Sequence, residues 1–487
     1  MNKNYLPIIL SLFIVFISMN SNANNLQISG LTVAFRNTTD KTITLDMNVS
    51  WDNSWKLNSD QSNWDAVWLF VKYRKLSEES WHHATLTHNS GHSAMNGTIV
   101  TDDDTGTGFS KGIFLYASNE HGQQSVDYDV TLQWEYGEDG QSDDDTFEFR
   151  VYGIEMVYIP AGQFYLGTDG NETDAFYTYN SDLSENPYLV ANENAITVGQ
   201  SDGNLYYSNS SANSSTIQDG TIPSNYPKGY DAFYCMKYEI TQGQYADFLN
   251  TLTDAQLGNS KTSGNVNFRD RITLNGDDYV SNYPYLPVNI INSNQILAYL
   301  DWAAIRPMTE LEFEKACRGN QAPVENENPW GDATAISSAI TLTDADLSTE
   351  VVSTGYSNVE GNANYLTIYS TPVRVGIFSS NANSRMEAGA TYYGILDMGG
   401  NVYETVISAG TSMGRLYEGS HGDGTLDSNG FHDVSDWPSA SSNTGIGQRG
   451  GSYRTNVDHM RVSNRIYAAL YNTGNGYSGG RGVRTAP

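Results

Sequence analysis

The C-terminal segment from residue 450 onward holds the largest group of side chains that could bind a ligand. Two irregular runs, 454–459 and 466–480, combine a guanidinium, a carboxylate, an imidazole and an amide with several tyrosines. These groups offer charge, hydrogen-bond donors and acceptors, and aromatic faces. We predict that they form a binding surface. The predicted ligand-binding residues are Ser452, Tyr453, Arg454, Asn456, Asp458, His459, Tyr467, Tyr471 and Tyr477.

Thiol chemistry has few candidates, because the chain contains only two cysteines, Cys235 and Cys317. Neither lies in the C-terminal segment. A thiolate is the form of cysteine that binds metals and attacks substrates. In an exported protein a disulfide can persist, but spacing along the chain does not give the distance between two residues. Both a Cys235–Cys317 disulfide and two buried free thiols therefore fit the sequence.

Three helices are expected to support the second part of the chain. Each begins with a capping residue followed three positions later by a glutamine or glutamate, which is the spacing of a capping box. Gly319 ends the third helix. We interpret the glutamates of that helix, at positions 310, 312 and 314, as capping and surface charges. The three capping pairs are Thr241 with Gln244, Asn292 with Gln295, and Thr309 with Glu312.

The first part of the chain, residues 24–152, alternates apolar and polar residues with a period of two. Such alternation is typical of strands with one buried face. We expect an all-β, immunoglobulin-like sandwich here, with residues 137–145 as a hairpin before the last strand and a domain boundary near Gly153. The inward positions of the clearest strand are Ile43, Leu45, Met47, Val49 and Trp51.

Charge excludes one class of partner. The chain has 56 acidic and 26 basic residues, giving a formal net charge of −30. Nucleic-acid binding depends on clustered lysine and arginine, so we expect no nucleic-acid partner. Acidity on this scale fits a well-solvated protein that binds cations or basic partners.

The N-terminus resembles a secretory signal peptide, which we assign to residues 1–23. Lys3 precedes an almost wholly apolar run, residues 6–19, and a small-residue site follows at residues 21–23. The run is shorter than the about 20 apolar residues of a membrane-spanning helix. We therefore expect no transmembrane segment and an exported protein that is periplasmic, associated with the cell surface or envelope, or secreted.

The second part of the chain, residues 153–487, resembles the formylglycine-generating enzyme (sulfatase-modifying factor) family. The resemblance rests on ordered blocks, of which residues 393–405, Tyr-Gly-Ile-Leu-Asp-Met-Gly-Gly-Asn-Val-Tyr-Glu-Thr, are the strongest. It implies a variant of the C-type lectin fold, so the expected fold class is α+β. The other blocks are residues 156–167, 233–241, 306–319, 328–331, 450–453, 461–465 and 482–484.

The resemblance also implies what the C-terminal segment lacks. Catalytic members of the family carry two cysteines there, which bind copper and perform an oxidation. The matching positions in this chain are Thr455 and Met460. A hydroxyl and a thioether do not supply the thiolate that this chemistry needs. We therefore expect no bound copper. The alternative interpretation is a metal-dependent oxidoreductase of the formylglycine-generating type that acts on protein cysteine.

A calcium site is a further implication of the resemblance. It maps onto one tight glycine-rich turn and the glutamate that follows it. Backbone carbonyls and a carboxylate are oxygen ligands of the kind that calcium takes. The expected metal residues are Gly399, Gly400, Asn401, Val402 and Glu404.

The preferred functional interpretation is a non-catalytic ligand-binding or display module with a calcium-stabilised fold. The two irregular runs lie between blocks that match the family, and this arrangement is similar to the variable proteins of diversity-generating retroelements. Every residue from 454 to 459 is reachable from an asparagine codon by changing its first two bases. The expected partner is a protein or a glycan.

Overall fold

A single long strand, β12 (Phe147–Ile159), joins the two parts of the chain in the computed structural model. The structure describes residues 20–21, 25–103, 106–170, 172, 174–182, 184, 186–208, 216–439, 444–470 and 473–487. β12 pairs with β4 of the N-terminal part along one edge and with β19 of the C-terminal part along the other. The boundary expected near Gly153 thus falls inside a strand shared by both parts.

Ten strands of the described residues form the sheet that contains β12. All neighbours in this sheet pair antiparallel except β22 and β25, which are parallel. The strands in order are β26 (Ile446–Arg449), β25 (Glu404–Ile407), β22 (Arg306–Thr309), β27 (Gly482–Thr485), β19 (Phe233–Met236), β12, β4 (Asp65–Lys75), β10 (Ile113–Ala117) and β8 (Gly97–Thr101), with β5 (His82–His83) beside β4.

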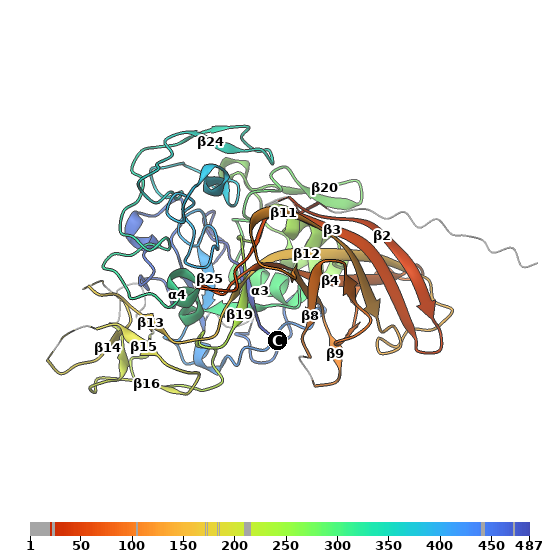
Figure 1. Ribbon diagram of the computed structural model, residues 1–487, viewed down its shortest axis with the longest axis horizontal. Coiled ribbons are helices and arrows are strands. Elements are labelled where there is room, and N and C mark those ends of the chain that lie inside the picture. The colour runs from red at the N-terminus through yellow and green to blue at the C-terminus, as the bar shows by residue number, and fades with distance from the viewer. Residues whose placement is uncertain are drawn as a thin grey trace, which may run out of the picture.

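A second sheet packs against those strands of the first sheet that come from the N-terminal part of the chain. The buried side chains of both sheets form one apolar cluster, to which the alternating residues of β3 contribute as the sequence predicted. Figure 1 shows these strands gathered at one end of the molecule. The strands in order are β1 (Asn20–Ser21), β2 (Leu26–Asn37), β3 (Thr42–Lys56), β11 (His121–Trp134), β6 (Leu86–Thr87) and β9 (Phe109–Ser110), with β7 (Ser93–Ala94) beside β11.

The hairpin expected at residues 137–145 is wrong. β11 and β12 flank this segment, but they belong to different sheets. The segment instead crosses from one sheet to the other. Aromatic side chains near the end of β11 fix it: the Trp134 indole nitrogen donates to Asp139 at 2.6 Å, and the Tyr136 hydroxyl donates to Asp143 at 2.7 Å. Local turn composition could not distinguish a hairpin within one sheet from a crossover between two sheets, because both connections are short and polar.

Four helices of the described residues lie in the C-terminal part. The three expected capping boxes are confirmed, and Gly319 ends α4 with a φ of 67°. The fourth helix, α2, was missed although Thr253 and Gln256 form the same capping signal. The helices are α1 (Gln242–Leu249), α2 (Asp254–Ser260), α3 (Ser293–Trp302) and α4 (Glu310–Arg318), with 3₁₀ turns η1 (Val266–Phe268), η2 (Ile377–Asn381), η3 (Gly414–Leu416) and η4 (Val457–Met460).

The rest of the C-terminal part consists of long irregular segments with small sheets. Several of these sheets lie at the end of the molecule opposite the N-terminal strands (Figure 1). The chain is therefore mostly β with few helices. The small sheets are β13 (Phe164–Leu166) with β15 (Tyr188–Val190); β14 (Tyr177–Thr178), β17 (Leu205–Tyr206), β16 (Ile196–Val198) and β18 (Gly220–Ile222); β20 (Ile272–Asn275) with β21 (Asp278–Ser281); and β23 (Thr341–Thr343) with β24 (Val351–Thr354).

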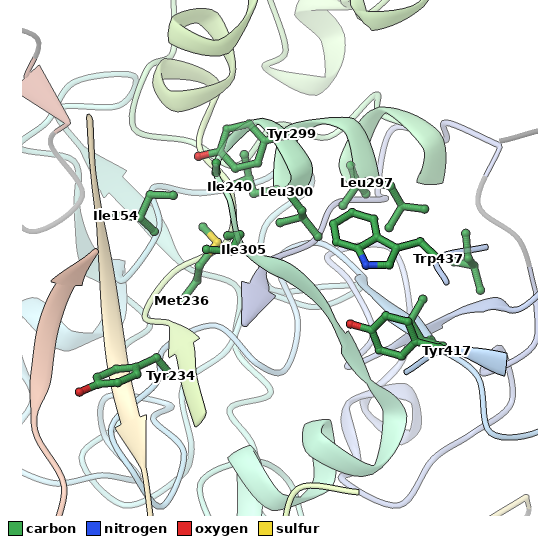
Figure 2. Packing of buried hydrophobic residues seen from close by; sticks show 14 of the residues in the cluster. Ile154, Tyr234, Met236, Ile240, Leu297, Tyr299, Leu300, Ile305, Tyr417 and Trp437 are labelled. Carbon is green, nitrogen blue, oxygen red and sulfur yellow. The ribbon is translucent and has the colours of Figure 1, made fainter. Parts of the chain in front are cut away.

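The largest apolar core lies between the shared sheet and the helices. Figure 2 shows Tyr299 and Leu300 of α3 on the side of Met236 of β19 and Ile154 of β12, and Leu297 beside Trp437. This core spans both parts of the chain, so burial of apolar surface holds them together. Among the described residues, no helix is long and apolar enough to cross a lipid bilayer. The expected signal peptide, residues 1–23, lies outside the described residues except for Asn20 and Ser21.

Candidate functional site

Buried arginines anchor the C-terminal segment to α4. The Arg449 guanidinium contacts the Glu310 carboxylate at 3.2 Å and the Glu314 carboxylate at 2.8 Å. The Arg465 guanidinium forms a two-point pair with the same Glu310 carboxylate, at 2.7 and 2.9 Å. All four side chains are almost fully removed from solvent. Glu310 therefore ties two points of the segment to one helix.

A third arginine anchors the end of the segment. The Arg481 guanidinium donates to the Glu404 carboxylate at 2.6 Å, and both side chains are fully buried. Arg481 also donates to the backbone carbonyls of Met236 and Lys237 in and next to β19. We call Arg449, Arg465 and Arg481 the framework arginines.

The α4 glutamates do not lie on the surface, so that part of their interpretation is wrong. Glu310, Glu312 and Glu314 are each at most 1% exposed. Glu312 does close the capping box, and its carboxylate also pairs with Arg306 at 2.6 and 2.9 Å. Buried charges need partners of this kind, and the partners come from residues far apart in the sequence. The sequence pattern alone did not reveal these pairs.

The two runs between the framework arginines enclose a cavity of about 310 Å³. We call it the tail cavity. Its size is near the lower end of the range of small-molecule sites. One wall comes from β26 and from the residue before β25, and the rest comes from the two runs. The lining residues are Tyr403, Gln448, Arg454, Thr455, Tyr467, Leu470, Asn475 and Tyr477.

Aromatic rings form one side of the tail cavity. The Tyr467 ring meets the Tyr403 ring edge to face, with centroids 5.7 Å apart and an interplanar angle of 79°. The His459 ring stacks on Tyr467 at 5.4 Å, and its Nδ1 lies 3.0 Å from the Tyr403 hydroxyl. Edge-to-face and stacked pairs of this kind fix the orientation of the rings. The cavity wall is therefore set before a ligand enters.

Protonation in this wall follows from burial. Burial raises the pKa of Tyr403, and the neighbouring Tyr467 adds to this effect. Burial lowers the pKa of His459, against a smaller opposing effect of Asp458. Near neutral pH Tyr403 is thus protonated and His459 is neutral. We assign the Tyr403 hydroxyl as the donor to Nδ1 of His459.

Arg454 provides positive charge at the edge of the tail cavity. Its guanidinium carbon lies 5.8 Å from the ring centroids of both Phe268 and Tyr477. The side chain is exposed. Among the described residues, no carboxylate forms an ion pair with Arg454. The charge is therefore available to a ligand.

The other predicted ligand-binding residues occupy different positions. Ser452 and Tyr453 are buried and do not line the cavity; the Tyr453 hydroxyl donates to the Gly476 carbonyl at 2.8 Å. Asn456 is exposed, and Asp458 pairs with Arg461 at 2.6 Å. Tyr471 lies outside the described residues.

Five lining residues were missed by sequence reasoning. Thr455 was considered only as the counterpart of a family cysteine. Tyr403 and Gln448 reach the cavity through the pairing of β25 with β26, which spacing along the chain does not reveal. The remaining two, Leu470 and Asn475, lie inside the second irregular run that the sequence did identify.

The described structure holds no thiol at the tail cavity. Thr455 lines it, while Met460 is fully buried in a cluster with Trp330 and Ala363. Cys235 in β19 and Cys317 in α4 are buried and unpaired, so the disulfide interpretation is wrong and the free-thiol alternative holds. Burial raises the pKa of Cys235 to about 12 and that of Cys317 well above its usual value. Neither thiol is poised as a thiolate.

The turn expected to bind calcium is held by protein groups. The Asn401 side chain accepts from the Val373 amide at 2.9 Å and donates to the Glu239 carboxylate at 2.7 Å. One Glu404 oxygen binds Arg481, while its Oε2 is buried without a protein partner. Burial raises the pKa of both Glu239 and Glu404, and the charge of Asp397 adds to each shift. A cation would satisfy the unpartnered oxygen and lower these pKa values, so the donor set fits one.

A separate group of carboxylates is a possible metal site. Ligand oxygens of Asp301, Asp423 and Asp433 lie within 4.8 Å of one another. Asp301 is buried at the end of α3 and accepts from the Asp423 and Asp433 amides at 3.0 and 3.2 Å. Burial and the charge of Asp423 raise the pKa of Asp301 to about 8. The sequence analysis did not find this site, because its members come from two distant segments.

Three kinds of comparison with known proteins differ in what they show. No curated protein matches the sequence. A solved structure titled "pH-induced modulation of Streptococcus parasanguinis adhesion by Fap1 fimbriae" is similar at 15% identity, over 36% of this chain and 82% of that chain, with a TM-score of 0.14. That score carries no argument about fold or function.

The strong match covers the C-terminal part together with the last N-terminal strand. The family described as the sulfatase-modifying factor enzyme 1-like domain matches residues 145–486, which is more than half of the chain. The matched region begins just before β12 and includes α4, the framework arginines and the tail cavity. The chain therefore belongs to the sulfatase-modifying factor enzyme 1-like domain family.

Proposed function

We propose that this protein is an exported ligand-binding or display module whose ligand occupies the tail cavity. The observation that carries the proposal is the lining of the cavity. Among the residues that the structure describes, it offers a guanidinium without an ion pair and three tyrosine rings, but no thiol. Such a site can bind and orient a ligand, yet it lacks the redox group of the family's cysteine chemistry.

The anchoring of the C-terminal segment supports this proposal. The framework arginines hold the segment through buried ion pairs that involve no residue of the two runs between them. The runs can then vary with little effect on the fold. This division agrees with the display modules of diversity-generating retroelements. It also agrees with an immunoglobulin-like N-terminal sandwich that presents a C-type lectin-like domain from the cell envelope.

Arg454 determines the charge of the ligand in this proposal. In a chain with a net charge of −30, an exposed arginine without an ion pair favours an anionic group. Tyrosine faces beside it suit a ring or an aromatic side chain. We infer that the ligand carries a carboxylate or sulfate on a glycan or a protein.

The test uses the full chain against arrays of acidic glycans and of acidic peptides. Arg454→Ala should weaken binding of any array ligand by about tenfold or more, since a charge-assisted hydrogen bond of roughly 1.5–3 kcal/mol is lost. Arg461→Ala is the matched control, because Arg461 lies in the same segment but pairs with Asp458 and does not line the cavity. Equal loss in both variants, or no loss in either, contradicts the proposal.

Family membership favours one alternative, an oxidoreductase that converts protein cysteine to formylglycine. This activity would need a metal site that does not use the two family cysteines. The assay is aldehyde formation in a Cys-x-Pro-x-Arg peptide with oxygen and either copper or iron. Aldehyde formed at the same rate by Arg454→Ala and Tyr467→Ala would place such chemistry outside the tail cavity.

Calcium stabilisation is the last element of the proposal. Two donor sets compete for the ion: the turn at Gly399–Glu404 and the carboxylates of Asp301, Asp423 and Asp433. Calcium should raise the melting temperature of the chelator-treated protein. Asp433→Asn removes an exposed member of the second set only. Loss of the calcium effect in this variant assigns the ion to the carboxylate group, and its retention assigns the ion to the turn.

A further inference from the structure

Two adjoining cavities lie where the N-terminal strands meet the C-terminal part. One measures about 570 Å³ and the other about 450 Å³, each within the range of small-molecule sites. Both are lined by Gln61, Tyr392 and Tyr393, so the two cavities adjoin at these residues. We call the pair the interdomain groove. It shares no lining residue with the tail cavity.

The walls of the interdomain groove are fixed relative to each other. The Gln61 amide donates to the Tyr392 carbonyl at 2.8 Å, and the Asn63 amide donates to the Tyr393 carbonyl at 2.7 Å. β12 connects the same two parts through one sheet. A ligand therefore meets a preformed site, which reduces the entropy cost of binding.

Trp55 is held in place at the centre of this region. Its backbone amide donates to the buried Asp65 carboxylate at 3.0 Å. The Lys237 ammonium lies 4.7 Å from the Trp55 ring centroid and 3.4 Å from Asp65. On the other part of the chain, a Cβ added to Gly394 would lie 3.1 Å from the indole. The absence of that atom lets the ring approach the backbone, and the indole remains half-exposed in the groove.

The cations of the groove are neutralised or bonded within the protein. Lys237 pairs with Asp65 and with Glu155 at 3.6 Å. The Arg385 guanidinium donates to the Pro329 carbonyl at 2.7 Å, and the Lys315 ammonium donates to the Gly162 carbonyl at 2.8 Å. Carbonyl oxygens do not neutralise the charges of Arg385 and Lys315, but these bonds direct donors of both cations toward the protein, and Lys315 is only 1% exposed. Arg454 at the tail cavity is exposed instead.

The groups left for a ligand are aromatic faces and uncharged polar side chains. Trp55 and Tyr392 supply the rings, whereas Tyr393 is only 3% exposed, and Gln61, Gln123 and Ser384 supply amides and a hydroxyl. Amides and hydroxyls both donate and accept, so they match a ligand rich in hydroxyl groups. Rings bury the apolar C–H face of a sugar while its hydroxyls bond at the edges. We propose that the interdomain groove binds a neutral oligosaccharide longer than one sugar unit.

Other ligand classes fit the groove less well. A nucleic acid or a strongly anionic glycan needs clustered cations that are free to bind phosphate or sulfate. A peptide that binds by strand addition gains its affinity by pairing with an exposed strand edge, and the segments that line the larger cavity are mostly loops. A neutral oligosaccharide needs neither feature.

The experiment is calorimetric titration of the full chain with neutral hexasaccharides of glucose, mannose, galactose and N-acetylglucosamine. At least one should bind, and Trp55→Ala should weaken it by about tenfold, which corresponds to loss of one ring contact. Trp81→Ala is the matched control, because Trp81 is another half-exposed indole of the N-terminal part, held by Arg74 and Arg150 outside the groove. Arg454→Ala should also leave this binding unchanged.

A second measurement tests the proposal even if the Trp55→Ala variant fails to fold. The chain labelled with 5-fluorotryptophan gives one fluorine resonance for Trp55, assigned with Trp55→Tyr. The bound hexasaccharide should shift that resonance and leave the Trp81 resonance in place. Absence of binding by all four sugars at millimolar concentration overturns the proposal. So does a bound sugar that leaves the Trp55 resonance unchanged, or a peptide from a random library that shifts it instead.

Discussion

The framework arginines and the runs between them lie in one segment but in opposite environments. Arg449, Arg465 and Arg481 are at most 3% exposed and paired with glutamates, whereas Arg454 is exposed without such a pair. A buried charge that loses its partner is costly, whereas an exposed one is not. The comparison shows that arginines of one segment can have different roles. The buried ones stabilise the fold, and the exposed one can contact a ligand.

The largest effect is expected from Glu310→Ala. This substitution leaves Arg465 without its carboxylate partner in the interior, while Arg449 keeps only Glu314. Breaking a buried pair in this way costs about 3–5 kcal/mol, measured as the free energy of unfolding in urea. Glu418→Ala, which removes an exposed glutamate, should change stability by less than about 0.5 kcal/mol. If both variants change the free energy of unfolding by a similarly small amount, the distinction between the framework arginines and the runs is contradicted.

A smaller effect is expected from Tyr453→Phe. Tyr453 was predicted to contact the ligand, but its hydroxyl is buried against the Gly476 carbonyl. Losing this hydrogen bond should cost about 1 kcal/mol of stability, while the Gly476 carbonyl keeps its bond from the Asn289 amide. Binding at the tail cavity should not change. The comparison requires thermal unfolding and array binding on the same sample, and loss of binding without loss of stability would return Tyr453 to the ligand-contacting set.

The smallest effect concerns His459 and pH. Burial lowers its pKa in the folded state, so the unfolded chain binds the proton more readily. Stability attributable to this group is present above its unfolded pKa of about 6.5 and is lost as pH falls through the folded value. His459→Gln keeps an acceptor for the Tyr403 hydroxyl but does not titrate. Melting curves between pH 5 and 8 should show the wild type losing stability relative to this variant at low pH, and parallel curves would contradict the assignment.

Local sequence signals predicted much of the fold because the physics that sets them is local. The capping pairs at Thr241, Asn292 and Thr309 satisfy backbone groups within one helical turn, so three helices followed from spacing alone. The alternation along β3 follows from the two faces of a strand. The missed helix α2 shows the same signal at Thr253. The capping signal that predicts α2 is therefore present in the sequence.

Features that depend on distant pairing could not be predicted in this way. The hairpin expected at residues 137–145 failed because the choice between sheets is decided by where β12 pairs, with β4 and β19. The partners of the α4 glutamates and the approach of Tyr403 to Tyr467 likewise depend on the three-dimensional fold. At the tail cavity, six lining residues lie in the two runs that the sequence singled out, whereas Tyr403 and Gln448 lie outside them. Sequence reasoning did not separate the lining residues from buried ones such as Ser452.

The most direct test of this account is a saturation library of residues 449–481, sorted for resistance of the folded chain to protease. Positions 449, 465 and 481 should tolerate almost no substitution, because each change removes a charged partner from a buried glutamate. Positions 454, 470 and 475, which are exposed and line the tail cavity, should tolerate most residues. Equal intolerance at the two sets of positions would contradict a fixed framework that carries a variable binding surface.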